Sequence, residues 1–265
     1  MQKSGIRFAA ASTAVAVVVV VGLAACGSSS SHATSVGAPA ASTTKPAATT
    51  PPTAGATTTT VAKAKPYDPN KPIDLGGTPG VTPAEQHRAE TLLRETIVDL
   101  RKYESPSEAY AAGYRSIGDA LTGDEHYIEW SDVDDGHILD PTRPESLVYE
   151  YRGGKQQVVA AMYMMPYGSR FTDVPDVGGP LTQWHIHDDL CLTNDPVQKT
   201  LSGGTTVNGQ CPPGSSKAGI MPMLHVWVVP NPCGPFAALE GPGAGQVPPG
   251  QTRLCDTAHG EAPTS

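Results

Sequence analysis

The chain has 265 residues, of which 38% are hydrophobic and 17% are charged, and its formal net charge is −8. No acidic residue precedes Asp68, so residues 66–265 carry a formal charge of −13, which disfavours nucleic acid as a partner. These residues are numerous enough to form one domain with a hydrophobic core.

The N-terminus begins with the basic residues Lys3 and Arg7, continues with the apolar run FAAASTAVAVVVVVG and reaches LAAC, which ends at Cys26. The apolar run has secretory length and is too short for a confident membrane-spanning helix. This order resembles the lipobox of bacterial lipoproteins. The resemblance implies a signal peptide over residues 1–25, cleavage before Cys26 and acylation of Cys26, for example with palmitate. An ordinary signal peptide with an incidental cysteine is the alternative.

Acylated Cys26 would hold the chain on the extracytoplasmic face of the cell membrane, with the lipid bilayer as its partner. Each buried methylene contributes roughly 0.8 kcal/mol, so two or three acyl chains give firm anchoring. Residues 26–65 follow as a segment of Ser, Thr, Ala and Pro that has almost no apolar side chains to bury. We expect this segment to be a disordered tether, with an average span of roughly 35 Å.

The domain is expected to open with two helices. Thr82-Pro83-Ala84-Glu85 forms a capping box with Pro at the first helical position, and apolar residues then recur at helical spacing through residue 103. Ser105-Pro106-Ser107-Glu108 repeats the same start signal and predicts a second, shorter helix over residues 105–118.

Strand patterns follow the helices. The segments SLVYEYR and QQVVAAMYMM flank Gly153-Gly154, which predicts a β-hairpin, and TQWHIH and MLHVWVVP are two further β-rich segments. Strands that come after helices indicate the α+β class rather than a parallel sheet. We therefore predict a single α+β domain over residues 66–265. In it, two N-terminal helices pack on a small antiparallel β-barrel or sandwich with long Gly/Pro-rich loops.

Four cysteines remain in the domain, and an even number outside the cytoplasm is typical of disulfide bonds. They are Cys191, Cys211, Cys233 and Cys255. Three pairings are possible. We favour Cys191–Cys211 and Cys233–Cys255, because each closes a short Gly/Pro-rich loop.

The stretch LTQWHIHDDLC contains His185 and His187, two residues apart. In a strand such residues point to the same side, so the two imidazoles would share a face. His225 lies in the other β-rich segment, and three imidazoles would converge if the two segments are neighbours. Three imidazoles plus water make an open zinc site, whereas Met221 and Met223 nearby would also suit copper. His126, in DEHYIEW, is a fourth candidate ligand.

The HxH pair with a later histidine resembles the metal motif of cupins, which are small β-barrels. His185 and His187 match the paired histidines of that motif, and His225 matches the last one. The chain departs from cupins where they usually carry Glu, because Cys191 and Leu192 occupy those positions. Separately, EHY…DGHILDPTRPESLVYE, WHIHDDLC and MLHVWVVPNPCGPFA together resemble a family of bacterial secreted or lipid-anchored proteins whose activity is uncharacterised.

We therefore expect a membrane-anchored extracytoplasmic lipoprotein with a histidine site for a transition metal, zinc or copper. The sequence leaves open whether it is an enzyme, and it indicates no protein partner. If the protein is an enzyme, Glu125 or Glu129 is the nearest candidate for proton transfer. The alternatives are a structural protein and a metal-free module of the cell envelope. Such a module would bind a sugar or peptide in a pocket lined by Tyr127, Trp184 and Trp227.

Overall fold

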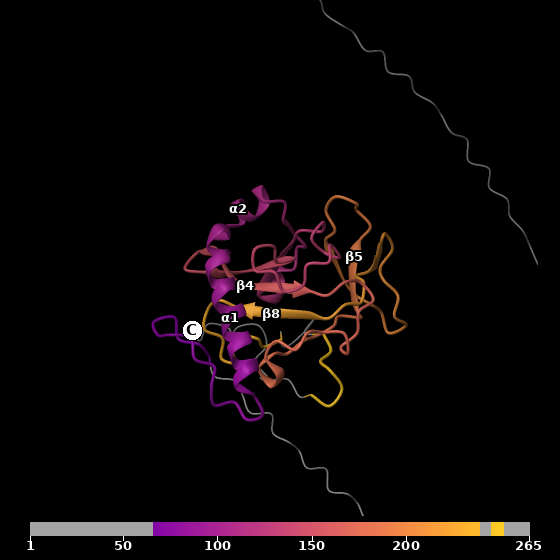
Figure 1. Cartoon of the computed structure of the whole chain (residues 1–265). Coiled ribbons are helices and arrows are strands. Elements are labelled where there is room, and N and C mark those ends of the chain that lie inside the picture. Colours follow the sequence, from indigo (N-terminus) through magenta and orange to yellow (C-terminus); the bar gives the residue numbers. More distant parts are fainter. Residues whose placement is uncertain (1–65, 239–244, 252–265) are drawn as a thin grey trace, which may run out of the picture. The chain divides into compact units, whose positions relative to one another are not determined.

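The computed structural model describes residues 66–238 and 245–251 (Figure 1). The expected signal peptide, Cys26 and the tether lie outside these residues, so their roles stay predictions. The described residues all fall in one structural unit. Within them, none of the helices combines the length and apolar character needed to span a bilayer.

The long helix α1 spans Pro83–Asp99 and begins at the capping box. The Thr82 side chain accepts a hydrogen bond from the Glu85 N–H at 3.2 Å, and the Glu85 carboxylate accepts one from the Thr82 N–H at 2.6 Å. The buried side of α1 presents Leu92, Leu93 and Thr96 to the sheet, and a 3-10 turn, η1 (Leu100–Tyr103), ends the helix.

The second helix is much shorter than the sequence predicts. α2 spans Pro106–Ala111 and starts at the Ser105/Glu108 capping box. The chain then leaves the helical path, because Gly113 adopts a φ of 108° and leads directly into β1 (Arg115–Ser116). The expected helix over residues 105–118 is therefore wrong in its second half.

Most of the domain is a five-stranded antiparallel sheet with the strand order β1-β2-β3-β4-β8. A 3-10 turn, η2 (Ala120–Thr122), separates the first two strands. Gly153 and Gly154 have φ values of 59° and 82°, as a two-residue hairpin turn between β3 and β4 requires. Besides β1, the strands are β2 (Asp124–Ile128), β3 (Ser146–Arg152), β4 (Lys155–Met164) and β8 (Met223–Trp227).

A smaller sheet has the order β6-β5-β7 and follows the 3-10 turn η3 (Gly179–Leu181). The predicted disulfide Cys191–Cys211 is confirmed, with an S–S distance of 2.02 Å. Cys233 is also disulfide-bonded, but its predicted partner Cys255 lies outside the described residues. The strands are β5 (Leu190–Thr193), β6 (Leu201–Gly204) and β7 (Ser215–Lys217).

The α+β class is correct, but the barrel is wrong because the two sheets are separate and open. The outer edge of β8 is already occupied, since His185 and Met223 exchange two backbone hydrogen bonds of 2.9 and 2.8 Å. The Trp227 N–H on the same edge donates to the Pro235 carbonyl at 2.8 Å. The expected strand over residues 182–187 is likewise reduced to two isolated bridges, at His185 and Ile186.

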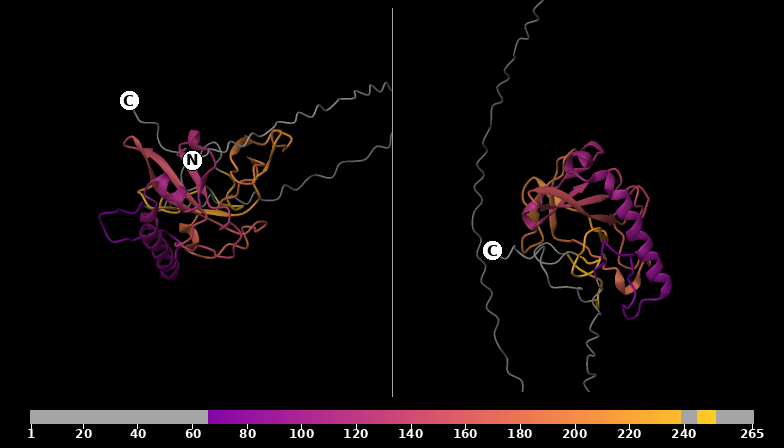
Figure 2. Two further views of the ribbon diagram at one scale, coloured as in Figure 1. Left: turned by 90° about the horizontal axis from the view of Figure 1, so that it is seen from above. Right: turned by 90° about the vertical axis from the view of Figure 1, so that its left-hand side faces the viewer.

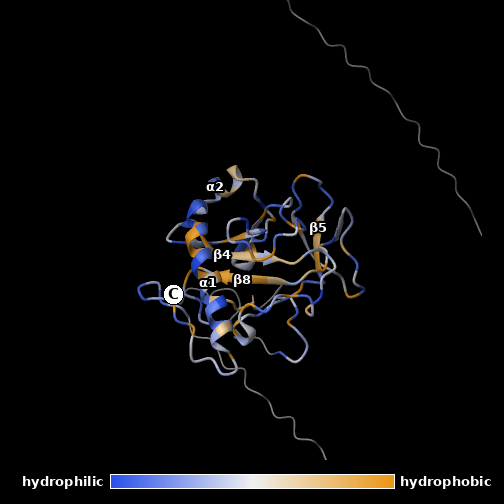
Figure 3. Cartoon of the chain, in the orientation of Figure 1, coloured by the Kyte–Doolittle hydropathy of each residue, from blue (hydrophilic) through white to orange (hydrophobic). Residues whose placement is uncertain are grey.

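The two faces of the five-stranded sheet carry different side chains. One face packs against α1 through a large apolar cluster that includes Leu93, Tyr163 and Leu224. The opposite face carries Met162 and Met164, which belong to a second cluster. Figures 1 and 2 show α1 and β5 toward opposite sides of this sheet, and Figure 3 shows the apolar character of β8. The histidines lie on the face away from α1.

Candidate functional site

Four buried histidines form one cluster of imidazole rings. Their exposed fractions are 6% for His126, 0% for His185, 7% for His187 and 0% for His225. The ring centroids lie 5.6 Å apart for His126 and His225, 4.9 Å for His185 and His225, and 5.1 Å for His185 and His187. Three segments that are distant in the sequence thus bring all four sequence-predicted histidines together.

One polar contact between described residues of this cluster joins His126 and His225, whose Nε2 atoms lie 3.2 Å apart. His126 is on β2 and His225 on β8, with β3 and β4 between them. On this face, β3 and β4 place four buried side chains between the two histidines, with Met162 directly opposite His225; they are Ser146, Val148, Ala160 and Met162.

Asp119 holds the other side of the His126 ring. Its carboxylate lies 2.6 Å from His126 Nδ1 and also accepts the His126 backbone N–H at 2.9 Å. Because the carboxylate is an acceptor, it favours the form of His126 that carries a proton on Nδ1. In the neutral ring this leaves the Nε2 lone pair directed toward His225.

The electrostatics of His126 reflect two opposing influences. Burial by itself lowers the pKa of His126, but the charge and hydrogen bond of Asp119 raise it, with further contributions from Asp124 and Glu125. The net result is a pKa above the ordinary value for histidine. Asp119 therefore both orients the ring and makes it more basic.

His185 and His225 are stacked, with an angle of 11° between their ring planes. Trp227 stacks on the same His225 ring, with centroids 5.5 Å apart and planes at 27°. His187, in contrast, stands nearly perpendicular to His185 at 87°. The bridge between His185 and Met223 fixes the backbone that positions this stack.

Gly245 and Gln246 pack beside His187. Gln246 exchanges two backbone hydrogen bonds with Ile186, of 2.6 and 2.8 Å. A Cβ atom at Gly245 would lie 2.9 Å from His187 Nδ1 and 2.6 Å from the Ile186 carbonyl oxygen, and the φ of Gly245 is 73°. Only glycine fits this close approach, so Gly245 is part of what positions the His187 ring.

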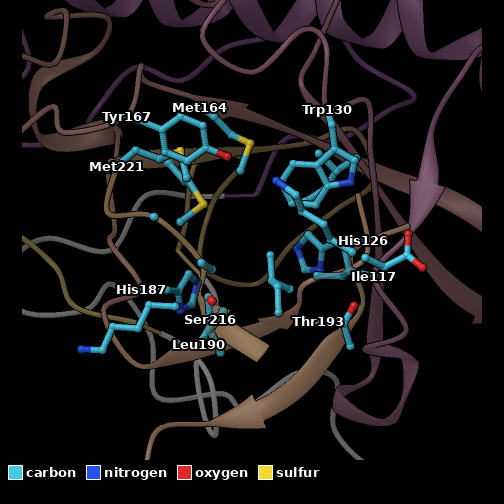
Figure 4. Close-up of a pocket in the computed structure, with 18 of the residues that line it drawn as sticks. Ile117, His126, Trp130, Met164, Tyr167, His187, Leu190, Thr193, Ser216 and Met221 are labelled. Carbon is cyan, nitrogen blue, oxygen red and sulfur yellow. The ribbon is translucent and has the colours of Figure 1, made fainter. Parts of the chain in front are cut away.

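A cavity of about 310 Å³ lies between this face of the five-stranded sheet and strands β5 and β7. Two of the clustered histidines, His126 and His187, line it. Figure 4 shows them on two sides of the cavity, with Met164, Met221 and Tyr167 grouped along another side. The imidazole cluster is therefore accessible from a space of the size that small ligands occupy.

Within residues 66–238 and 245–251, no three or more His, Cys, Asp or Glu side chains are already arranged to hold a metal ion. The stacking of His185 on His225 is one geometric reason why these rings are not already arranged around a metal ion. A nitrogen lone pair lies in its ring plane, and the nearly parallel planes of His185 and His225 do not meet at one point. A metal bound by both His185 and His225 thus requires a rotation of one of these rings, and the expected metal site stays a prediction.

The two glutamates predicted as candidates for proton transfer make their hydrogen bonds outside the imidazole cluster. Glu125 alternates with His126 on β2, and its carboxylate accepts hydrogen bonds from Ser116 and Gln156. Glu129 accepts hydrogen bonds from Ser131, of 3.1 Å from its backbone and 2.6 Å from its side chain. Among the described residues, Asp119 is a carboxylate that contacts the cluster; it lies seven residues before His126, and no motif in the sequence marks it.

The three aromatic residues predicted to line a sugar or peptide pocket do not line the cavity beside the histidines. Tyr127 and Trp184 are buried in the apolar cluster beneath α1. Trp227 is buried too, and its indole N–H donates to the Ala237 carbonyl at 2.9 Å. None of these three aromatic residues lines the cavity beside the histidines, so they serve as core residues.

Comparison of the chain with protein-family models, curated proteins and solved structures finds no match. The site therefore has to be interpreted from its own geometry.

Proposed function

We propose that this protein is a membrane-anchored extracytoplasmic lipoprotein that binds a transition metal ion, zinc or copper, through His126, His185, His187 and His225. The observation that carries the metal proposal is the contact of 3.2 Å between His126 Nε2 and His225 Nε2, with Asp119 behind His126. The lipobox resemblance supports acylation of Cys26 and hence the location.

The distance between the two nitrogens suits a shared metal ion. Zinc–nitrogen bonds of about 2.0–2.1 Å at tetrahedral angles place two ligand nitrogens about 3.3 Å apart. The observed 3.2 Å between His126 and His225 is close to that separation. The same distance also fits a direct hydrogen bond between the rings, so distance alone supports both states.

Asp119 supplies the second argument for a metal. Histidine ligands usually donate their other ring N–H to a carboxylate or carbonyl, which fixes the ring and makes it a better ligand. Asp119 lies 2.6 Å from His126 Nδ1 and is itself buried. This contact leaves Nε2, the nitrogen nearest to His225, as the metal-binding atom of His126.

His187 and His185 would complete the coordination. For His185 to join the coordination, its ring would have to rotate out of its stack with His225. His187 lines the cavity, as His126 does, so a further coordination position would face that space. A metal there would supply Lewis acidity to a bound water or ligand. The thioethers of Met221 and Met223 nearby are soft ligands, which keeps copper beside zinc in the proposal.

The test is the metal-to-protein ratio, measured by mass spectrometry on protein that is exported natively without a tag. We expect about one zinc or copper per chain, and little in the variant with His185→Ala and His187→Ala. His137→Ala is the matched control, because His137 is exposed and pairs with Asp135 at 3.1 Å. Equal, substoichiometric metal in all three proteins would refute the metal site.

A further inference from the structure

The cavity beside the histidines has a wall of methionines. Its lining includes four of the six methionines in the chain, whereas Met165 belongs to the packed core beneath α1. The thioether side chain is flexible and polarisable, and it makes favourable contacts with aromatic rings. The four cavity methionines are Met162, Met164, Met221 and Met223. Such a wall adapts to the flat, apolar body of a ligand.

The remaining walls strengthen the preference for an apolar ligand. Ile117, Ile128, Leu190 and Leu192 contribute aliphatic surface, and Trp130 contributes an indole ring. Figure 4 shows Trp130 and Tyr167 at separate parts of the lining. A cavity of about 310 Å³ is at the small end of ligand pockets, which suits a molecule with one or two rings.

The charged groups of the cavity favour an anion. Lys199 lines it, although the domain as a whole is strongly acidic, whereas the ammonium group of exposed Lys217 lies beside Gly209, outside the lining. Lys199 Nζ lies 4.5 Å from the centre of the Trp130 ring, and within the described ranges Lys199 forms no ion pair. The one acidic residue of the lining, Asp195, accepts the backbone N–H groups of Val197 and Gln198 at 2.8 and 2.9 Å.

We propose that this cavity binds a small aromatic anion, with its rings against the methionine wall and its acidic group near Lys199. Binding needs no metal, so this proposal stands or falls separately from the metal site. His126 and His187 line the same space and would lie beside the bound molecule.

The test uses the full chain with ¹³C-labelled methionine methyl groups, treated with a chelator to remove metal. The probe is 2-naphthoate, and 2-naphthalenemethanol is its neutral counterpart with the same rings. We expect the acid to shift the methyl signals of Met162, Met164, Met221 and Met223, and to leave Met165 unchanged. The acid should bind at least tenfold more tightly than the alcohol.

Variants then locate the acidic group. Lys199→Gln should abolish the preference for the acid and leave the melting temperature unchanged. Lys155→Gln is the matched control, because Lys155 is exposed and lies outside the cavity lining. The proposal is overturned if neither probe shifts the cavity methionines, if acid and alcohol bind equally to the unmodified chain, or if the Lys199→Gln variant keeps the preference. Repeating the titration with metal present tests the metal site separately.

Discussion

The two faces of the five-stranded sheet are built from alternating residues of the same strands, yet they differ in chemistry. On β8, Leu224 belongs to the cluster under α1, whereas Met223 and His225 lie on the other face. On β4, Tyr163 packs toward α1 and donates or accepts a hydrogen bond of 2.7 Å with Thr96. The α1 face is filled, and the opposite face retains a cavity and four imidazoles.

The difference between the two faces of the sheet indicates where the functional site lies. Burying polar rings and leaving a void both cost stability, because polar groups lose water and the residues that line a void lose packing contacts. The α1 face shows that this chain can fill a core with apolar side chains. The histidine face departs from that pattern on the same strands, and such departures concentrate at functional sites.

The largest effect is expected from Glu145, which lies just before β3 and accepts the Met164 N–H at 3.1 Å. Burial raises the pKa of Glu145 from 4.5 to about 8. Between these pH values the folded protein keeps a proton that the unfolded chain has released. Stability therefore falls as the pH rises through this window, by up to about 5 kcal/mol.

Glu145→Gln should remove this loss of stability at high pH, because glutamine does not ionise. Urea unfolding of the wild-type protein and the variant at pH 5, 6.5 and 8 gives the difference directly. We expect the variant to be more stable at pH 8 relative to wild type than at pH 5. The same pH slope in both proteins would show that Glu145 ionises without cost and that the junction beside Met164 is wetter than the structure implies.

The second prediction compares neighbouring residues on β8. Leu224→Ala removes a fully buried side chain from the filled face and should cost about 4 kcal/mol of unfolding free energy. Met223→Ala should cost about 2 kcal/mol, because one side of Met223 already borders the cavity and loses no contacts there. Denaturant unfolding measures both. A larger loss for Met223 would mean that the two faces are packed alike.

The third prediction concerns the small sheet that covers the cavity. Replacing Cys191 and Cys211 together by Ser removes the disulfide that closes this segment, which should lower stability by about 3 kcal/mol. Because β5 and β7 line the cavity, 2-naphthoate binding should weaken as well. Calorimetry provides the melting temperature. An unchanged melting temperature would show that this sheet adds nothing to the cooperative unit.

The smallest effect is expected from Asp119→Asn. The amide nitrogen that faces His126 Nδ1 would favour the form of the ring with its proton on Nε2, and this proton would have to leave before Nε2 could bind a metal. We expect metal affinity to fall 10- to 100-fold, or about 1–3 kcal/mol. Metal titration measures the affinity, and ¹⁵N spectra of the ring identify the proton position. Unchanged affinity together with a changed tautomer would remove His126 from the ligand set.

The sequence predicted much of the scaffold from local signals. The Thr82 and Ser105 capping boxes, the Gly153-Gly154 hairpin and the Cys191–Cys211 disulfide all depend on residues close together in the chain. The two-residue spacing of His185 and His187 likewise anticipated that their rings would contact each other.

Local sequence signals could not predict the long-range features of the fold. The end of α2 depends on Gly113, and the failure of the sheet to close depends on which segment takes the edge of β8. Asp119 reaches His126 only because η2 folds back onto β2. Gly245 meets His187 across 57 intervening residues. No spacing rule encodes such tertiary contacts.

The most direct test of the central claim is anomalous diffraction from crystals of the protein loaded with zinc or copper. Our account predicts one anomalous peak about 2.0–2.1 Å from both His126 Nε2 and His225 Nε2, with the His185 ring turned out of its stack. The contrary result is the absence of a peak there at saturating metal, with the two nitrogens still 3.2 Å apart and His185 still stacked on His225.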